Sequence, residues 1–173
     1  MRTLEEIKRY AIKCHNDTNH LYDTLPYVFH LSSVVELAEK YIYLIPKKDK
    51  DLVIAACWCH DLIEDTRQTW NDVIKETGSI EVAEIVYALT NEKGKTRKDR
   101  ANDKYYKGIK DTRYATFVKL CDRLANTKYS KTTGGSMHSR YKEEFFDFYL
   151  ELSVKLDGYG ELYSEMWDEL KTL

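Results

Sequence analysis

The sequence predicts an all-α protein built as a single compact helical bundle. Glycine and proline are scarce, with seven Gly and two Pro among 173 residues, so few positions interrupt a helix. Apolar residues recur at three- and four-residue intervals, which is helical spacing, and no segment alternates as a half-buried strand does. The length is that of one domain, and we expect this domain to span residues 1–173.

Capping and turn residues predict where the helices begin and end. Thr3 and Glu6 have the spacing of a capping box at the start of the first helix. Pro26 suits the first turn of the second helix, after a polar loop. Gly78 and Ser79 end one helix and cap the next. The expected helices lie at about residues 3–14, 26–46, 51–66, 69–77, 80–90, 114–128, 138–156 and 161–170, with a further helix that begins near residue 98.

Charge is unevenly distributed, although the net charge is only −2. Residues 91–113 carry nine Lys or Arg against four acids, and residues 143–173 carry nine acids against two Lys. The basic segment is either an ordinary solvated face or a contact for a phosphate-bearing ligand. The acidic C-terminal helices, expected at about 138–171, argue against an extended nucleic-acid interface.

The sequence shows no membrane or secretion signal. No apolar run approaches the roughly 18 residues of a membrane span, and the first residues lack the layout of a signal peptide. We therefore expect a cytoplasmic protein that makes no membrane contact. Assembly as a homo-oligomer is left open.

Acidic and imidazole side chains occupy apolar helices, where a buried charge needs compensation. His60 and Asp61 are adjacent on the most apolar helix, and Glu64 and Asp65 follow within about one turn on the same side. Asp122 stands among the apolar residues of another helix. A divalent cation would offset these charges, because imidazole and carboxylate groups are common ligands of such ions.

The same positions carry a resemblance to a known family. The order of His30, His60-Asp61 and Asp122, together with the segments HDLIEDT and VKLCDRLAN, resembles the HD superfamily of metal-dependent phosphohydrolases. The chain is most similar to the hydrolase domain of RelA/SpoT proteins and to stand-alone Mesh1-type small alarmone hydrolases, over about residues 10–149. The resemblance implies an HD-domain helical bundle. It also implies removal of pyrophosphate from the 3′ position of (p)ppGpp or (p)ppApp.

Individual roles are implied by this resemblance. The expected ligands of a single divalent ion, usually Mn²⁺ in this branch, are His30, His60, Asp61 and Asp122. The expected catalytic pair, which orients and activates water or assists the leaving group, is Glu64 and Asp65. Asn126 matches a residue near the nucleotide sugar, and Lys95 and Arg97 lie where the family offers basic side chains to the pyrophosphate.

Departures from the family pattern leave the base preference open. Relatives carry a basic pair that holds guanine a few residues before Pro26, and the matching positions here are Leu21 and Tyr22. Tyr22 could instead stack on a base, or it could pack as a core or surface residue. Leu31 replaces the proline that follows the first metal histidine, and Ala125 replaces a histidine.

Three functions are consistent with these residues. The first is an alarmone or nucleotide pyrophosphohydrolase that acts on a small phosphorylated nucleotide. The second is a 5′-nucleotidase-type HD phosphohydrolase, which would keep the metal ligands and release orthophosphate from a nucleoside monophosphate. The third is a non-catalytic module that binds a nucleotide without turnover, although the intact Glu64 and Asp65 argue against it.

Overall fold

In the computed structural model, residues 1–156 and 160–173 are described, and their fold confirms the all-α prediction. The α-helices are α1 (Leu4–Asp17), α2 (Val28–Tyr41), α3 (Lys50–Cys59), α4 (Leu62–Asp65), α5 (Trp70–Thr77), α6 (Ile80–Leu89), α7 (Arg97–Arg100), α8 (Asp103–Asp111), α9 (Ala115–Thr133), α10 (Ser136–Leu152) and α11 (Ser164–Thr172). Two 3-10 helices, η1 (Ile42–Leu44) and η2 (Lys47–Asp49), connect α2 to α3. Two short antiparallel pairs complete the described part: β1 (Leu21–Tyr22) with β2 (Leu25–Pro26), and β3 (Lys155–Leu156) with β4 (Gly160–Glu161).

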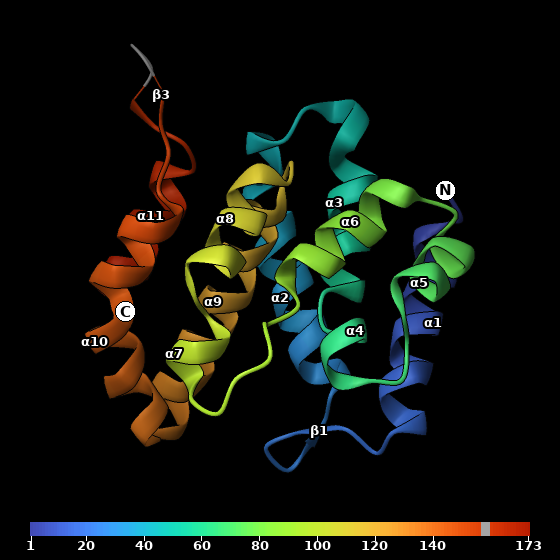
Figure 1. Cartoon of the computed structure of the whole chain (residues 1–173), viewed down its shortest axis with the longest axis horizontal. Helices are drawn as coiled ribbons and strands as arrows, with labels where there is room; N and C mark the ends of the chain where they lie inside the picture. Colours follow the sequence, from blue (N-terminus) through green and yellow to red (C-terminus); the bar gives the residue numbers. More distant parts are fainter. Residues whose placement is uncertain (157–159) are drawn as a thin grey trace.

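Helices α2, α3 and α9 form the centre of the bundle. α2 packs against both α3 and α9, and Figure 1 shows α1 and α5 on one side of this centre and α10 and α11 on the other. The helix α3 is buried on nearly all sides, since every residue from Val53 to Cys59 belongs to the core. A helix without a polar face is stable only inside a fold, which explains the position of α3.

Several helix ends follow local capping chemistry, but the predicted start of the second helix at Pro26 is wrong, because Pro26 lies in β2 and α2 begins only at Val28. Thr3 and Thr69 each form a complete capping box, at the starts of α1 and α5. Gly78 ends α5 in the left-handed conformation, with φ 67°, and the side chain of Ser79 accepts a backbone N–H at the start of α6. Local chemistry therefore determines these boundaries.

The prediction of one continuous helix over residues 51–66 is wrong. α3 ends at Cys59 and α4 begins at Leu62, so His60 and Asp61 lie in a bend between two helices. Consecutive side chains on an uninterrupted helix point about 100° apart, because one turn takes 3.6 residues. In the bend the backbone of Asp61 leaves the helical conformation, with φ −100° and ψ 4°, and the side chains of both neighbours reach the same point.

Smaller differences concern helix lengths. α1 continues to Asp17 instead of ending near Cys14, so the buried His15 belongs to a helix and not to a loop. α9 continues to Thr133, α10 ends at Leu152, and α11 begins at Ser164 instead of near residue 161. The end of α1 was predicted too early because the prediction relied on the spacing of apolar residues, and the buried residue after Cys14 is a histidine.

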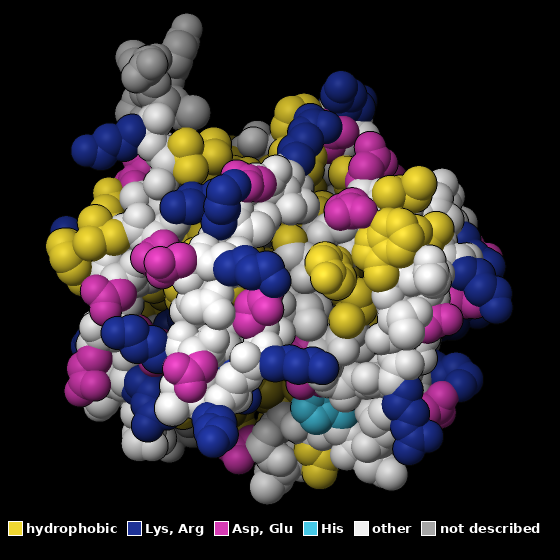
Figure 2. Space-filling model, viewed as in Figure 1, with side chains coloured by type: hydrophobic (Ala, Val, Ile, Leu, Met, Phe, Trp, Pro, Cys, Tyr) yellow, Lys and Arg dark blue, Asp and Glu magenta, His cyan; other side chains and the backbone are white. Residues whose placement is uncertain are grey.

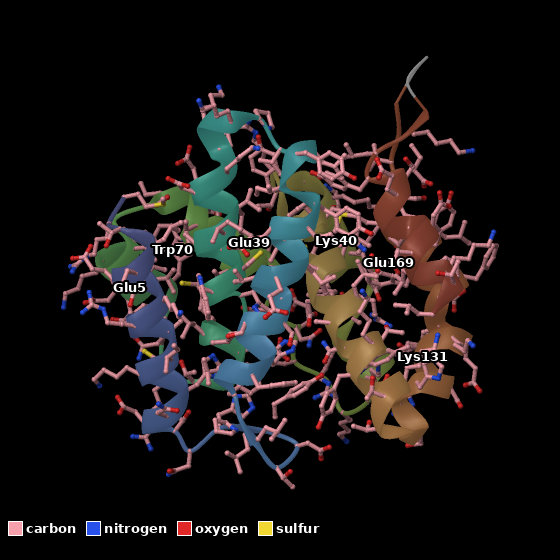
Figure 3. All side chains as sticks on the ribbon, turned by 180° about the vertical axis from the view of Figure 1, so that it is seen from behind. Glu5, Glu39, Lys40, Trp70, Lys131 and Glu169 are labelled. Carbon is pink, nitrogen blue, oxygen red and sulfur yellow. The ribbon has the colours of Figure 1, made fainter. Side chains whose placement is uncertain are left out.

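Polar contacts dock the C-terminal helix α11 on the centre of the bundle. Glu169 on α11 accepts hydrogen bonds from Lys40 Nζ at 2.9 Å and from the hydroxyl of Tyr41, and its other oxygen lies 2.6 Å from Lys128 Nζ. Figure 3 shows Lys40 and Glu169 close together, on α2 and α11. α11 is thereby tied to α2 and α9, two of the helices that carry the site described below.

The visible surface carries both signs of charge. Figure 2 shows Lys and Arg side chains interspersed with Asp and Glu over the face formed by α6, α7 and α8. No helix in the described part of the chain has both the length and the apolar composition needed to cross a membrane.

Candidate metal centre and active site

Two imidazoles and two carboxylates meet inside the bundle. The Nε2 atoms of His30 and His60 lie 3.2 Å apart. Asp61 Oδ2 is 2.8 Å from His60 Nε2 and 3.6 Å from His30 Nε2. Asp122 Oδ1 is 3.4 Å from His30 Nε2 and 3.9 Å from His60 Nε2. Each carboxylate is therefore within 4 Å of both imidazoles, and the fold brings the four predicted ligands together.

Three distant stretches of the chain supply these side chains. His30 lies in the first turn of α2, shortly after its N-terminal Tyr27. His60 and Asp61 come from the bend between α3 and α4. Asp122 lies in the middle of α9 and is buried. His30, His60 and Asp122 form a buried group whose ligand atoms all lie within 4.8 Å of one another.

Neighbouring groups orient His60 and Asp61. His60 Nδ1 lies 2.8 Å from the carbonyl oxygen of Cys57, one turn earlier on α3. A neutral His60 that donates from Nδ1 presents the lone pair of Nε2 toward the other ligands. The hydroxyl of Tyr27 donates to Asp61 Oδ2 at 2.5 Å. Both contacts are of the kind that holds metal ligands in place.

Asp122 is held by two neighbours on its own helix. Lys119 Nζ donates to Asp122 Oδ2 at 2.9 Å, and Asn126 Nδ2 donates to Oδ1 at 2.5 Å. These residues stand three positions before and four positions after Asp122, so all three share one face of α9. Burial raises the pKa of Asp122, but Lys119 and the contact with His30 outweigh it and hold this pKa well below its usual range.

The electrostatics of the group favour a cation. Burial alone would lower the pKa of His30, yet the contacts with Asp122 and Asp61 raise it to about 9. The carboxylates that attract a proton to this imidazole would also attract a divalent ion. Two imidazole nitrogens and two carboxylate oxygens are a suitable donor set for such an ion, so the residues present fit the metal that the sequence predicts.

The predicted catalytic pair lies on the short helix α4 beside this group. Tyr27 Oη lies 3.4 Å from Asp65 Oδ2 as well as contacting Asp61. Burial, followed by the charges of Asp61 and Glu64, raises the pKa of Asp65 to about 7. Glu64 is exposed and turns toward Asn91, whose backbone N–H and Nδ2 donate to its two carboxylate oxygens at 3.1 and 2.7 Å.

The predicted substrate-binding residues occupy different surroundings. Lys95 is exposed in the segment between α6 and α7. Arg97, the first residue of α7, donates two hydrogen bonds to the carboxylate of Glu144 on α10, at 2.9 and 3.1 Å. Asn126 and Tyr22 lie next to the metal group, where Tyr22 Oη donates to Asn126 Oδ1 at 2.8 Å.

Sequence reasoning gave no role to several residues of the site. Lys119 could have been found, because it stands three residues before Asp122 on the same predicted helix. Tyr27 stands three residues before the predicted ligand His30, but no role was predicted for it. Asn91 gave no sequence signal, since 27 positions separate it from Glu64.

Two further histidines lie close to the centre without belonging to the buried group described above. His15 and His20 contact each other through their Nδ1 atoms at 3.0 Å, and both rings stack on Tyr27, with centroid distances of 4.3 and 3.9 Å. Burial lowers the pKa of His15 to about 4, so its ring is neutral near pH 7. The two rings therefore pack against Tyr27, whose hydroxyl donates to Asp61.

Two comparisons with known proteins concern the family and the fold of this chain. The model of the HD domain matches residues 27–127, a range that contains all four predicted ligands. A solved structure described as a metazoan ortholog of SpoT, which hydrolyzes ppGpp and plays a role in starvation responses, superimposes with a TM-score of 0.67 at 22% sequence identity. The match covers 96% of this chain and 92% of the other, so the two share a fold over nearly their whole lengths.

Proposed function

The chain belongs to the HD domain family, and from that membership we propose that it is a metal-dependent nucleotide phosphohydrolase. The proposed reaction is removal of pyrophosphate from the 3′ position of (p)ppGpp- or (p)ppApp-type alarmones, the nucleotides of the stringent response. One observation carries the proposal: both imidazoles lie within 4 Å of both carboxylates in one group. The described activity of the structurally similar SpoT ortholog supports the choice of substrate.

We propose Mn²⁺ as the ion, held by His30, His60, Asp61 and Asp122. Mixed imidazole and carboxylate ligation suits a six-coordinate ion of this kind better than a tetrahedral structural zinc. When bound, such an ion acts as a Lewis acid that lowers the pKa of water and offsets charge on phosphoryl oxygens.

The catalytic pair, Glu64 and Asp65, would orient the attacking water and transfer its proton. Asp65, with a pKa near 7, can hold or release a proton in the neutral range, which suits a general acid or base. Glu64 is held from both oxygens by Asn91, so its carboxylate has a defined direction in which to orient a water molecule. Tyr27 contacts both Asp61 and Asp65, and it would therefore hold Asp65 close to the proposed ligands.

The basic residues Lys95 and Arg97 would supply positive charge to the phosphates of the substrate. Lys95 is exposed, whereas Arg97 forms an ion pair with Glu144 that it would have to leave. We propose both residues as pyrophosphate contacts, with the guanidinium of Arg97 exchanging one anionic partner for another. Asn126 is proposed to lie near the sugar.

A hydrolysis screen tests the proposed function. The purified protein, supplied with Mn²⁺ or with a chelator, is incubated with guanine and adenine alarmones, nucleoside 5′-monophosphates, deoxynucleotides and NADPH, and the products are identified by mass. We expect Mn²⁺-dependent release of pyrophosphate from 3′-diphosphate nucleotides, and no release by the Asp61→Ala variant.

Other products would point to other functions. Orthophosphate released from nucleoside 5′-monophosphates alone would replace this proposal with a 5′-nucleotidase-type activity. Nucleotide binding without turnover under any divalent metal would make the chain a binding module.

A further inference from the structure

A tight hairpin places Tyr22 next to the predicted metal ligands His30 and Asp122. β1 and β2 pair Tyr22 with Leu25, and the turn between them passes through Asp23 in the left-handed conformation, with φ 59°. The chain then enters α2, so Tyr22 and His30 are only eight positions apart and lie face to face. Their rings stack at a centroid distance of 4.7 Å with an interplanar angle of 19°.

The hydroxyl of Tyr22 reaches the other side of the same group. It donates to Asn126 Oδ1 at 2.8 Å, and Asn126 Nδ2 donates in turn to Asp122 Oδ1 at 2.5 Å. Tyr22 thus contacts His30 directly through its ring and is connected to Asp122 through the carboxamide of Asn126. The two ends of the Asn126 amide are both occupied by these bonds.

Neighbouring aromatic rings already surround Tyr22. Tyr129 lies 4.7 Å from it and Phe29 lies 6.3 Å from it, measured between centroids, in addition to the stacked His30. Burial raises the pKa of the phenol, so it stays protonated and remains a donor. A nucleobase would have to compete with these rings for the faces of Tyr22.

We propose that Tyr22 is a positioning residue of the metal centre, which aligns ligands from two helices at once. Its ring fixes the orientation of the His30 imidazole, and its hydroxyl, through Asn126, fixes the carboxylate of Asp122. We propose this role for Tyr22 in place of the base stacking that the sequence left open. It rests on the proposed function only in requiring that the four ligands bind a divalent ion.

Metal titration without substrate tests the proposal. Mn²⁺ binding is measured by calorimetry for the wild type, Tyr22→Phe, Asn126→Ala and the double variant. Tyr22→Phe keeps the ring and removes only the hydroxyl, and we expect it to weaken Mn²⁺ binding by about 3- to 10-fold, the range of one lost hydrogen bond between neutral groups. In the Asn126→Ala background the same change should have no further effect.

Tyr129→Phe is the matched control. Its hydroxyl also ties the hairpin to α9, through a 3.2 Å bond to Asp23, but that bond reaches no ligand. We expect this variant to bind Mn²⁺ within about 2-fold of the wild type, because the lost bond holds the hairpin and contacts no ligand. The melting temperature of each metal-free variant separates an effect on folding from one on the centre.

The outcomes distinguish this proposal from the proposed function. Wild-type affinity in Tyr22→Phe would overturn the positioning role while leaving the metal centre intact. A loss of affinity that is equal with and without Asn126 would also overturn it, because the hydroxyl would then act by another route. Absence of Mn²⁺ binding by the wild type would refute the metal centre, and the positioning role with it.

Discussion

Replacing Tyr27 with Phe isolates one hydrogen bond at the base of the site. The hydroxyl of Tyr27 donates to Asp61 Oδ2 at 2.5 Å and lies 3.4 Å from Asp65 Oδ2, and the side chain is 6% exposed. Phenylalanine keeps the ring that stacks on both His15 and His20, so no cavity forms. The change therefore removes one donor from a buried carboxylate and leaves the packing in place.

The expected cost follows from the charge of the acceptor. A hydrogen bond to a charged group contributes about 1.5–3 kcal/mol, against about 0.5–1.5 kcal/mol for one between neutral groups. We expect Tyr27→Phe to lower the free energy of unfolding by about 1.5–3 kcal/mol. For a chain of this size, that corresponds to a fall in melting temperature of roughly 3–12 °C.

Tyr105→Phe provides the comparison. Tyr105 is 4% exposed and its hydroxyl donates to a neutral acceptor, the carbonyl oxygen of Leu89, at 3.2 Å. Urea unfolding of both variants in the presence of a chelator gives the two free-energy changes without a contribution from metal binding. If Tyr27→Phe is no more destabilising than Tyr105→Phe, the hydroxyl of Tyr27 is not supporting a charged carboxylate and the reasoning fails.

Four further predictions concern the ligands, the catalytic pair with its neighbour Asn91, and pH. Asp61→Ala should keep its helical circular dichroism and lose Mn²⁺-dependent hydrolysis; unchanged hydrolysis would remove Asp61 from the centre. Glu64→Gln should lower kcat by about 10²–10⁴-fold while retaining Mn²⁺ affinity. Asn91→Ala, which spares the backbone donor, should lower kcat by only about 10-fold, and equal turnover would mean that Asn91 does not position Glu64. Burial raises the pKa of Glu169, but hydrogen bonds from Lys128, Tyr41 and Lys40 outweigh it and lower this pKa from 4.5 to about 2. Its contribution to stability is therefore complete above pH 4.5 and is lost as pH falls toward 2. Glu169→Gln should thus show a smaller drop in melting temperature between pH 6 and pH 3 than the wild type, and an identical drop would exclude Glu169 as a source of acid sensitivity.

Local signals in the sequence were sufficient for most of the helices. Thr3, Thr69 and Gly78 act through hydrogen bonds or dihedral angles within a few residues, so their effect on helix ends can be predicted without knowledge of the fold. Asp122 could be singled out for a similar reason, because a carboxylate among apolar residues of a helix requires a partner.

Contacts between distant segments could not be predicted in the same way. The bond between Glu64 and Asn91 depends on how α4 packs beside the end of α6, and nothing at either position indicates the other. The same holds for Tyr22, where the residue type allowed base stacking, core packing or surface exposure. Its contacts with His30 and Asn126 depend on the hairpin geometry and on the placement of α9 beside α2.

The sequence by itself determined that this chain is helical and that His60, Asp61 and Asp122 are unusual for their surroundings, and the family resemblance added His30. Both properties are local, since helix periodicity and the cost of burying a charge depend on residue type and near neighbours. Only the tertiary structure decided that the helix breaks after Cys59, which turns His60 and Asp61 toward a common point. It also decided which groups hold each ligand, because a hydrogen bond depends on the distance and direction between atoms that the chain brings together only on folding.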